Sequence, residues 1–181
     1  MRRKFLSVVL CVCMMLTMAP FAFAADDSGD STNNNVSTGS GGGTVNQAVA
    51  QIDNTTYNTL SDAITAAGNG KTITLLKNTS GEVVIPTDKN ITLDLNGNTI
   101  THTGTTVYNL GNLTICDSSN DKTGKIISTG NVGVGVGHDS TTTIEYANIK
   151  AVEGAVITGY ATGATITIKD GNYSASDNAV I

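Results

Sequence analysis

Tryptophan is absent from this chain of 181 residues, and arginine and phenylalanine occur only within the first 23 positions. Arg2, Arg3 and Lys4 are three of the ten basic residues, so the remainder has seven Lys against fifteen Asp and Glu, a net charge of 7 − 15 = −8. Nucleic acids and anionic membranes are bound through clusters of basic side chains. The composition therefore excludes nucleic acid as a partner.

Cysteine is also scarce. Two of the three Cys, at positions 11 and 13, fall within the apolar start of the chain, which leaves Cys116 alone. A single Cys cannot form an internal disulfide framework. Because no His or Lys is adjacent to it in sequence, we interpret Cys116 as a small buried thiol among stacked strands rather than a reactive one.

The first 24 residues have the three parts of a secretory signal peptide. A basic start (Arg2–Lys4) precedes a mostly apolar core (Phe5–Met18), and Ala22-Phe23-Ala24 is a small-x-small cleavage site. The apolar core is too short for a membrane span. No second apolar run of spanning length follows, so we expect a mature chain without a transmembrane span that is secreted and located at the cell surface.

Residues 25–48 are rich in Ser, Asn and Gly and contain few apolar residues. Such a segment cannot bury enough apolar surface to offset the entropy of ordering, so we predict a disordered linker. The composition changes near Val49, and we assign residues 49–181 to one folded domain. Its last residues, Ala179-Val180-Ile181, continue a strand pattern without a cap, so we expect further C-terminal coils and domains of a longer chain.

One short amphipathic helix is predicted over residues 59–68. The residues with the spacing of one helical face are Leu60, Ala63, Ile64 and Ala67. Thr59 or Ser61 is suited to the N-cap. Because this helix directly precedes the first strand, we expect its apolar face to cover the N-terminal end of a stack of strands.

From residue 72 onward, short segments alternate apolar and polar residues, as in Ile91, Leu93 and Leu95, and Gly, Asn and Asp separate them. This pattern is typical of strands with one buried face. The predicted strands are Thr72–Leu76, Glu82–Ile85, Asn90–Leu95, Thr99–Thr101, Thr105–Leu110, Leu113–Cys116, Lys125–Ser128, Val132–Val136, Thr142–Tyr146, Ala155–Ile157, Thr165–Ile168, Tyr173–Ala175 and Ala179–Ile181. The positions taken as equivalent in successive segments are Leu75, Leu93, Ile115, Ile144 and Ile168, at spacings of 18, 22, 29 and 24. Many short strands also occur in antiparallel sandwiches and barrels, but the recurrence favours the stacked coils of a parallel β-helix, or solenoid.

Three segments carry a resemblance to a known group. Tyr57–Ile64, Gly70–Leu76 and Asn90–Gly97 together are similar to the start of the β-helix domains of the pectin-lyase-like superfamily, in particular those of large exported surface proteins of Gram-positive gut bacteria. The resemblance extends from about Gln51 to the end of the chain. It implies an all-β, right-handed parallel β-helix with one short N-terminal capping helix, in a superfamily that contains both polysaccharide-cleaving enzymes and inactive adhesins and stalks.

No residue is assigned as catalytic. Gly137-His138-Asp139 is similar to the Gly-His-Gly segment of polygalacturonases, but those enzymes also need paired carboxylates, which protonate the leaving oxygen and activate water. Pectate lyases use an Arg base, and Arg is absent after position 3. We therefore interpret His138 as part of a turn and favour a protein that is not an enzyme.

Calcium is the one cofactor that the sequence brings into consideration. Asp94, Asp117 and Asp170 follow similar strands at related positions, and Ca²⁺ prefers several oxygen ligands. However, Asp at the end of a strand commonly forms a turn by accepting hydrogen bonds from the nearby backbone. Because no Gly-Gly-x-Gly-x-Asp repeat is present, turn formation is the favoured interpretation and no cofactor is expected.

The candidate binding surface consists of Gly133, Gly135, Gly137, Tyr146 and Tyr160. The glycines alternate with inward Val residues, so their outward side would be bare backbone that a ligand can approach closely. An outward pair of tyrosines can stack on sugars, and tyrosines that pack on neighbouring coils are the alternative.

Together these features predict a secreted or cell-surface β-helix protein. It would serve as a non-catalytic, adhesin-like head or stalk that binds polysaccharide or host glycan. The first alternative is a polysaccharide lyase or hydrolase whose catalytic residues lie outside this fragment, and the second is a purely structural spacer.

Overall fold

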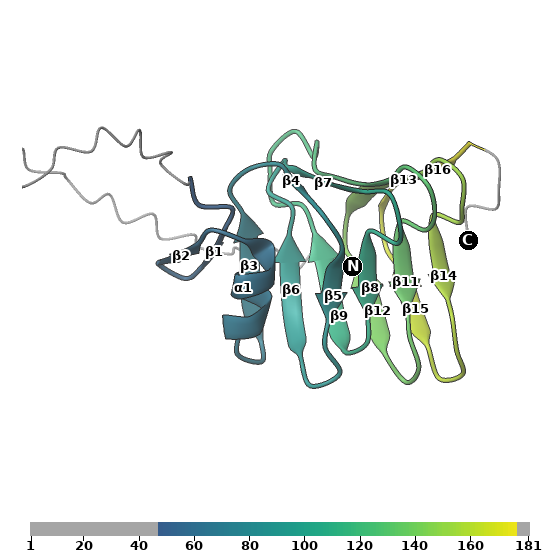
Figure 1. Cartoon of the computed structure of the whole chain (residues 1–181), viewed down its shortest axis with the longest axis horizontal. Coiled ribbons are helices and arrows are strands. Elements are labelled where there is room, and N and C mark those ends of the chain that lie inside the picture. Colours follow the sequence, from purple (N-terminus) through teal and green to yellow (C-terminus); the bar gives the residue numbers. More distant parts are fainter. Residues whose placement is uncertain (1–46, 177–181) are drawn as a thin grey trace, which may run out of the picture. The chain divides into compact units, whose positions relative to one another are not determined.

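The computed structural model describes residues 47–176. The predicted signal peptide, nearly all of the predicted linker and the predicted strand at 179–181 lie outside these residues. The described chain is a parallel β-solenoid of about 4 turns with one short helix, which confirms the predicted fold class. Figure 1 shows its strands stacked side by side, with α1 (Leu60–Ala66) at the N-terminal end of the stack.

Each coil contributes one strand to each of three sheets. From the N-terminal end of the stack, the coil strands of sheet A are β3 (Lys71–Leu75), β6 (Asn90–Asp94), β9 (Asn112–Cys116), β12 (Thr141–Ile144) and β15 (Thr165–Ile168). Sheet B consists of β4 (Thr79–Ser80), β7 (Thr99–His102), β10 (Lys125–Ser128), β13 (Ala147–Ala151) and β16 (Gly171–Ala175). Sheet C consists of β5 (Val83–Ile85), β8 (Val107–Asn109), β11 (Val134–Val136) and β14 (Ile157–Gly159).

The core is a column of aliphatic side chains stacked from coil to coil. In sheet A this column contains Ile73, Leu93, Ile115, Ile144 and Ile168. The sequence predicts that Leu75 lies opposite Leu93. This prediction is wrong by two residues, because Ile73 pairs with Leu93. A shift of two residues keeps every side chain on the same face of a strand. For this reason the predicted inward side of the strand is correct, although the first two equivalent residues, Ile73 and Leu93, are 20 positions apart rather than 18.

The outward face of sheet A carries an unbroken column of threonines. Its members, in register from β3 to β15, are Thr72, Thr92, Thr114, Thr143 and Thr167. Threonine is favoured here because its branched Cβ suits the pleated strand while its hydroxyl stays in contact with water. Like-with-like stacking of this kind requires that parallel coils keep the same register, so it is a direct consequence of the solenoid topology.

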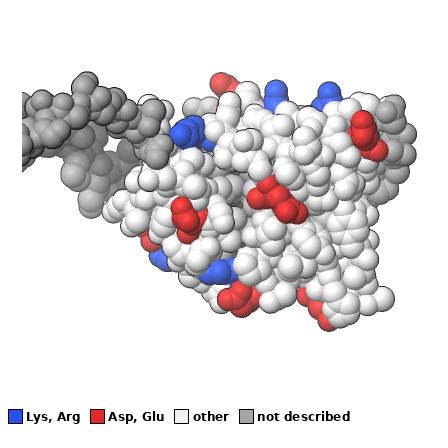
Figure 2. All heavy atoms as spheres, in the orientation of Figure 1, with Lys and Arg blue, Asp and Glu red and all other residues white. Residues whose placement is uncertain are grey.

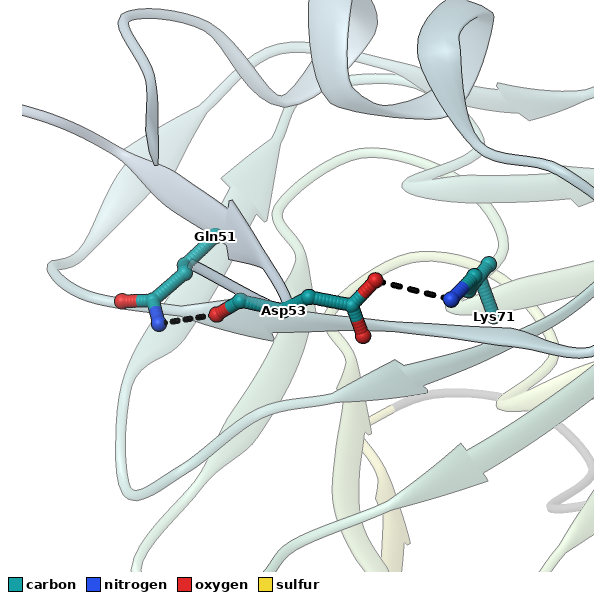
Figure 3. Close-up of polar contacts among 3 residues, drawn as sticks. All are labelled: Gln51, Asp53 and Lys71. Atoms are coloured by element: carbon teal, nitrogen blue, oxygen red, sulfur yellow. Dashed lines mark hydrogen bonds and ion pairs between the residues drawn. The ribbon is translucent and has the colours of Figure 1, made fainter. Parts of the chain in front are cut away.

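The N-terminal end is closed by the predicted helix and by a hairpin that the sequence analysis missed. β1 (Ala50–Ile52) pairs antiparallel with both β2 (Thr55–Tyr57) and β3, so it covers the free edge of sheet A. The hairpin turns at Asp53, which has a positive φ of 50°. Its carboxylate is 2.7 Å from Nζ of Lys71, and the Gln51 amide donates to its backbone carbonyl, as Figure 3 shows.

Helix α1 covers the rest of this end. The Thr59 hydroxyl accepts a hydrogen bond of 3.0 Å from the backbone N–H of Asp62, which is the expected N-cap interaction. Leu60, Ala63 and Ile64 are buried against β1, β2, β3 and β5. The capping role predicted for this helix is therefore confirmed.

Four strands were not predicted. β1 and β2 form the hairpin, β4 has only two residues, and β13 has the sequence Ala-Asn-Ile-Lys-Ala, in which a single residue is β-branched. β1, β4 and β13 have weak local preferences, and their pairing with stronger neighbours determines their conformation. β2, with the sequence Thr-Thr-Tyr, has strand-forming residues but is only three residues long. The remaining predicted strands within the described residues agree to within a few residues at their ends.

Candidate functional site

Charged side chains are scattered singly over the face of the molecule in Figure 2, and most of that surface is uncharged. Among the described residues, the side chains that are both large and apolar and well exposed are Leu76, Val84 and Tyr160. Val84 and Tyr160 both belong to the side of the solenoid formed by sheet C. The outward face of this sheet is therefore the candidate site.

Tyr108 occupies the centre of this face. Its neighbours in β8, Val107 and Asn109, are buried, so the alternation of the strand directs the tyrosine outward. In register, Tyr108 lies opposite Val84 on one side and Gly135 on the other. The missing side chain at Gly135 leaves room beside the Tyr108 ring.

Tyr160 fills that room. It follows β14, and its backbone N–H donates to the carbonyl of Val136 at 2.8 Å. Its ring lies over Gly135, where an added Cβ would be only 2.4 Å from Cε2 of the tyrosine. The Tyr160 hydroxyl is 3.2 Å from the Thr105 hydroxyl. The Tyr160 ring therefore packs directly on the backbone of Gly135, and any larger residue at position 135 would displace the ring.

The two rings form an edge-to-face pair with centroids 5.8 Å apart and planes at 72°. This is a preferred geometry for aromatic pairs. Together with Thr105 and Glu82, the rings line a hollow of about 290 Å³. Tyr160 remains 49 % exposed, so part of its ring is open to solvent. An exposed tyrosine ring, with hydroxyl and carboxylate groups at its margin, can stack on the apolar face of a sugar and accept hydrogen bonds from it.

The predicted binding residues do not gather at one place. Gly133, Gly135 and Gly137 are all buried. A Cβ at Gly133 would meet Ile149 and the carbonyl of Val156, and one at Gly137 would meet Leu110. The expectation of bare, approachable glycine backbone is thus wrong, because neighbouring side chains cover it. At Gly135 it is the covering tyrosine that faces the solvent.

We call the hollow lined by Tyr108, Tyr160, Thr105 and Glu82 the tyrosine platform. Tyr146 lies away from this platform, between β12 of sheet A and β13 of sheet B. Nζ of Lys122 is 5.7 Å from the centroid of its ring, and its hydroxyl is 3.4 Å from the Asn172 amide. These contacts hold the ring against a loop and a neighbouring coil. Of the two predicted tyrosines, only Tyr160 therefore belongs to the platform, and its ring partner is Tyr108.

Two of the calcium candidates have their carboxylate oxygens engaged by the backbone. Oδ1 of Asp94 accepts hydrogen bonds from the N–H groups of Asn96 and Ser118, at 3.0 and 2.9 Å. The partners of Asp117, all at 3.1 Å or less, are the N–H groups of Gly97, Ser119 and Gly124 and the Ser119 hydroxyl. Both residues therefore act as turn formers, as the favoured interpretation proposed.

The three carboxylates also do not form one column. Asp94 pairs in register with Cys116, which places Asp117 one position further along its strand. Asp170 lies beyond β15, where its Oδ1 is 2.7 Å from the N–H of Gly171. Within residues 47–176 no group of three or more His, Cys, Asp or Glu is arranged to hold a metal ion. That no cofactor is bound stays a prediction of the sequence, with calcium as its alternative.

The environment of Asp117 changes its acidity. Burial alone would raise its pKa, but the hydrogen bonds from Ser119, Gly97 and Gly124 stabilise the carboxylate more strongly, and the pKa is lowered.

Cys116, by contrast, lies on the outward side of sheet A and is partly buried rather than enclosed in the core. Burial, together with the nearby charge of Asp94, raises its pKa to about 11, so the thiol stays protonated and unreactive.

The His138 segment forms a turn between β11 and β12. Nδ1 of His138 is 2.7 Å from the Asp139 carboxylate, and both side chains are exposed. Asp139 has a positive φ of 50°, as expected for a tight turn.

In the described part of the chain, no helix is long and apolar enough to cross a membrane.

Sequence reasoning missed Thr105 and Glu82 as members of the platform. They come from earlier coils than Tyr160, and only the stacking of coils brings them together. Tyr108 and Tyr160 were recognisable as rare aromatics, but their pairing across 52 positions depends on the register of sheet C. No local signal in the sequence indicates this register.

No protein-family model, no curated protein and no solved structure matches the chain. The fold is therefore established by the structure itself, and the function has to be argued from the surface of the solenoid.

Proposed function

We propose that this protein is a secreted, non-catalytic β-solenoid of the adhesin-like type that binds an uncharged polysaccharide or host glycan. The observation that carries the proposal is the outward pair of rings formed by Tyr108 and Tyr160. The leader-like first 24 residues and the acidic, Arg-free remainder support an extracellular setting. The parallel solenoid supports the resemblance to β-helix domains of the pectin-lyase-like superfamily in bacterial exported proteins.

The platform suits a sugar because it is held in place before a ligand arrives. Gly135 supports the Tyr160 ring, Tyr108 contacts its edge and Thr105 lies within hydrogen-bond distance of its hydroxyl. A ring that is already ordered loses little conformational entropy when a ligand stacks on it. The Glu82 carboxylate at the margin of the hollow disfavours acidic sugars and can accept hydrogen bonds from sugar hydroxyls.

A glycan array probed with the purified chain tests this proposal, followed by titration of any neutral oligosaccharide that binds. Tyr160→Ala should weaken binding about tenfold, which corresponds to the loss of one stacking interaction of ~1.4 kcal/mol. Tyr146→Ala is the matched control, because it removes the same ring from another side of the solenoid. Equal affinity of wild type and Tyr160→Ala would show that the platform is not the binding site.

The enzymatic alternative is separated by a different readout. A lyase releases an unsaturated product and a hydrolase releases reducing ends, so both are detectable on polysaccharides that the protein binds. We expect neither product. Turnover by a longer form of the chain would assign the catalytic residues to coils outside residues 47–176.

A further inference from the structure

A second hollow lies on sheet B, away from the tyrosine platform. It has a volume of about 340 Å³, and the residues that line it are Lys125, Ile127, Asn148, Ile149, Lys150, Asn172 and Ser174. They come from the three neighbouring strands β10, β13 and β16. The hollow therefore spans three successive coils.

The two lysines of this hollow differ from the other lysines of the described chain. Each of the other five contacts a specific acceptor; these lysines are Lys71, Lys77, Lys89, Lys122 and Lys169. Lys125 and Lys150 are exposed and have no hydrogen bond or ion pair with any residue from 47 to 176. The unpartnered ammonium groups of an acidic chain are thus concentrated in one hollow.

The register explains why these charges stay unpaired. The cross-strand neighbours of Lys125 are Thr99 and Asn148, and those of Lys150 are Ile127 and Ser174. None of these neighbours is acidic. Because Lys125 pairs with Asn148, Lys150 is its diagonal neighbour, at a typical Cα separation of about 7–8 Å. Both side chains lie on the outward face of sheet B, so their ammonium groups repel each other unless an anion lies between them.

Sheet A provides a contrast within the same molecule. There Lys169 faces Glu145 on the neighbouring coil, and Nζ is 2.7 Å from Oε1. The solenoid can therefore neutralise a lysine by placing a carboxylate in the next coil. On sheet B the residues that face the two lysines are Thr99, Asn148, Ile127 and Ser174. None of them carries a charge, so the positive potential of both ammonium groups stays available to a ligand.

The floor of the hollow is rigid and partly apolar. The Asn148 amide donates to the carbonyls of Lys122 and Gly124, and its oxygen accepts a hydrogen bond of 2.7 Å from Asn172. Ile127, the cross-strand neighbour of Lys150, contributes apolar surface to the hollow. Such a surface suits an extended ligand that carries both CH groups and anionic substituents.

We propose that this hollow binds the sulfate esters of an extended polysaccharide. Lysine is a compact point charge that binds tetrahedral oxyanions without the paired hydrogen bonds that the planar fork of Arg makes, and Arg is absent after position 3. The inference does not depend on the tyrosine platform, because the two hollows share no residue. If the tyrosine platform does not bind glycan, the proposal for the sheet B hollow can still be tested, and the reverse also holds.

Binding of the full chain to four immobilised probes tests the proposal: dextran sulfate, inorganic polyphosphate, polygalacturonate and unmodified dextran. We expect dextran sulfate to bind, with an affinity that falls as salt is raised. Tighter binding of polyphosphate would assign the hollow to a phosphate polymer and overturn the sulfate assignment. No binding of dextran sulfate, or equally tight binding of polygalacturonate, also overturns it.

Substitutions locate the site. Lys125→Met and Lys150→Met should each weaken binding about two- to fivefold, and the double variant about tenfold, as expected for exposed charge contacts. The matched control is Lys71→Met with Lys77→Met, which removes the same charge from elsewhere. An equal loss in the control would show that only net charge matters and would overturn the site. Lys125→Arg with Lys150→Arg should keep the affinity, and circular dichroism checks that every variant is folded.

Discussion

The two ends of the described solenoid are built differently. At the N-terminal end, the β1–β2 hairpin covers the edge of sheet A, and Leu60 and Ile64 of α1 are buried on the first coil. In the last described coil, the inward side chains Ile166, Ile168 and Tyr173 remain partly exposed. Their counterparts one coil earlier are buried: Thr142, Ile144 and Ile149, in that order. The difference teaches that a coil gains its full burial only when it has a neighbour on both sides.

The largest expected effect comes from a charge placed in the core column. Ile73→Asp should prevent folding, because Ile73 is 0 % exposed and directly under the cap. The change forfeits about 1.5–3 kcal/mol of burial and adds several more for an unpaired buried charge. Ile168→Asp, in the same column of the last described coil, should leave a folded protein with a lower melting temperature.

Thr92→Asp is the control for that comparison. It introduces the same charge on the outward face of sheet A and should change the melting temperature little. If circular dichroism showed the same loss of structure for Ile73→Asp and Ile168→Asp, the two ends would be equivalent and the comparison would fail.

The second prediction concerns the cap. Leu60→Ala should lower the free energy of unfolding by about 2–4 kcal/mol, since it opens a cavity between α1 and the first coil. Ile166→Ala should cost clearly less, because its side chain is only partly buried. Urea unfolding measures both values. Native-state hydrogen exchange should show increased exchange in β1–β3 for Leu60→Ala and in β15 for Ile166→Ala.

The smallest effect is expected from acid, and it weakens the region between the ends. Asp117 joins the turn at Gly97 to the loop that ends at Gly124. Because its pKa is lowered in the folded chain, the stability it contributes is present above the ordinary carboxyl pKa of 3.8 and is lost as the pH falls through the lowered value. We expect a loss of about 1–3 kcal/mol over this range.

Asp117→Asn is the test of the acid effect. The amide keeps one acceptor oxygen but replaces the other with a donor that faces the N–H of Gly124. The variant should be less stable at neutral pH and should show a smaller drop in melting temperature below pH 4 than the wild type. An unchanged acid profile would show that other carboxylates cause the drop.

Much of the fold was predictable because the coils repeat one simple pattern. The alternation of Ile91, Leu93 and Leu95 identified the buried face, and the Thr59 cap with Leu60 identified the helix. The exact register was not predictable, since Leu75 and Ile73 fit the pattern equally well and only their packing on Leu93 and Leu95 distinguishes them.

The candidate sites were less accessible to sequence reasoning. The sequence predicts bare surface at Gly133, Gly135 and Gly137, because it does not show that Tyr160 folds back over Gly135. The unpaired state of Lys125 and Lys150 likewise depends on which residues face them one coil away. Both features arise from contacts between coils, and periodicity along the chain carries no information about them.

The closed N-terminal end is also the part of the domain that is synthesised first. Once α1 and the hairpin have settled on β3, the other edge of that strand is ready to receive β6, about twenty positions later. Every later rung can then be laid down on the one before it, with short loop closures and no need to wait for the remainder of the polypeptide. The architecture thus supports vectorial folding, in which coils are added in one direction from the folded N-terminal cap.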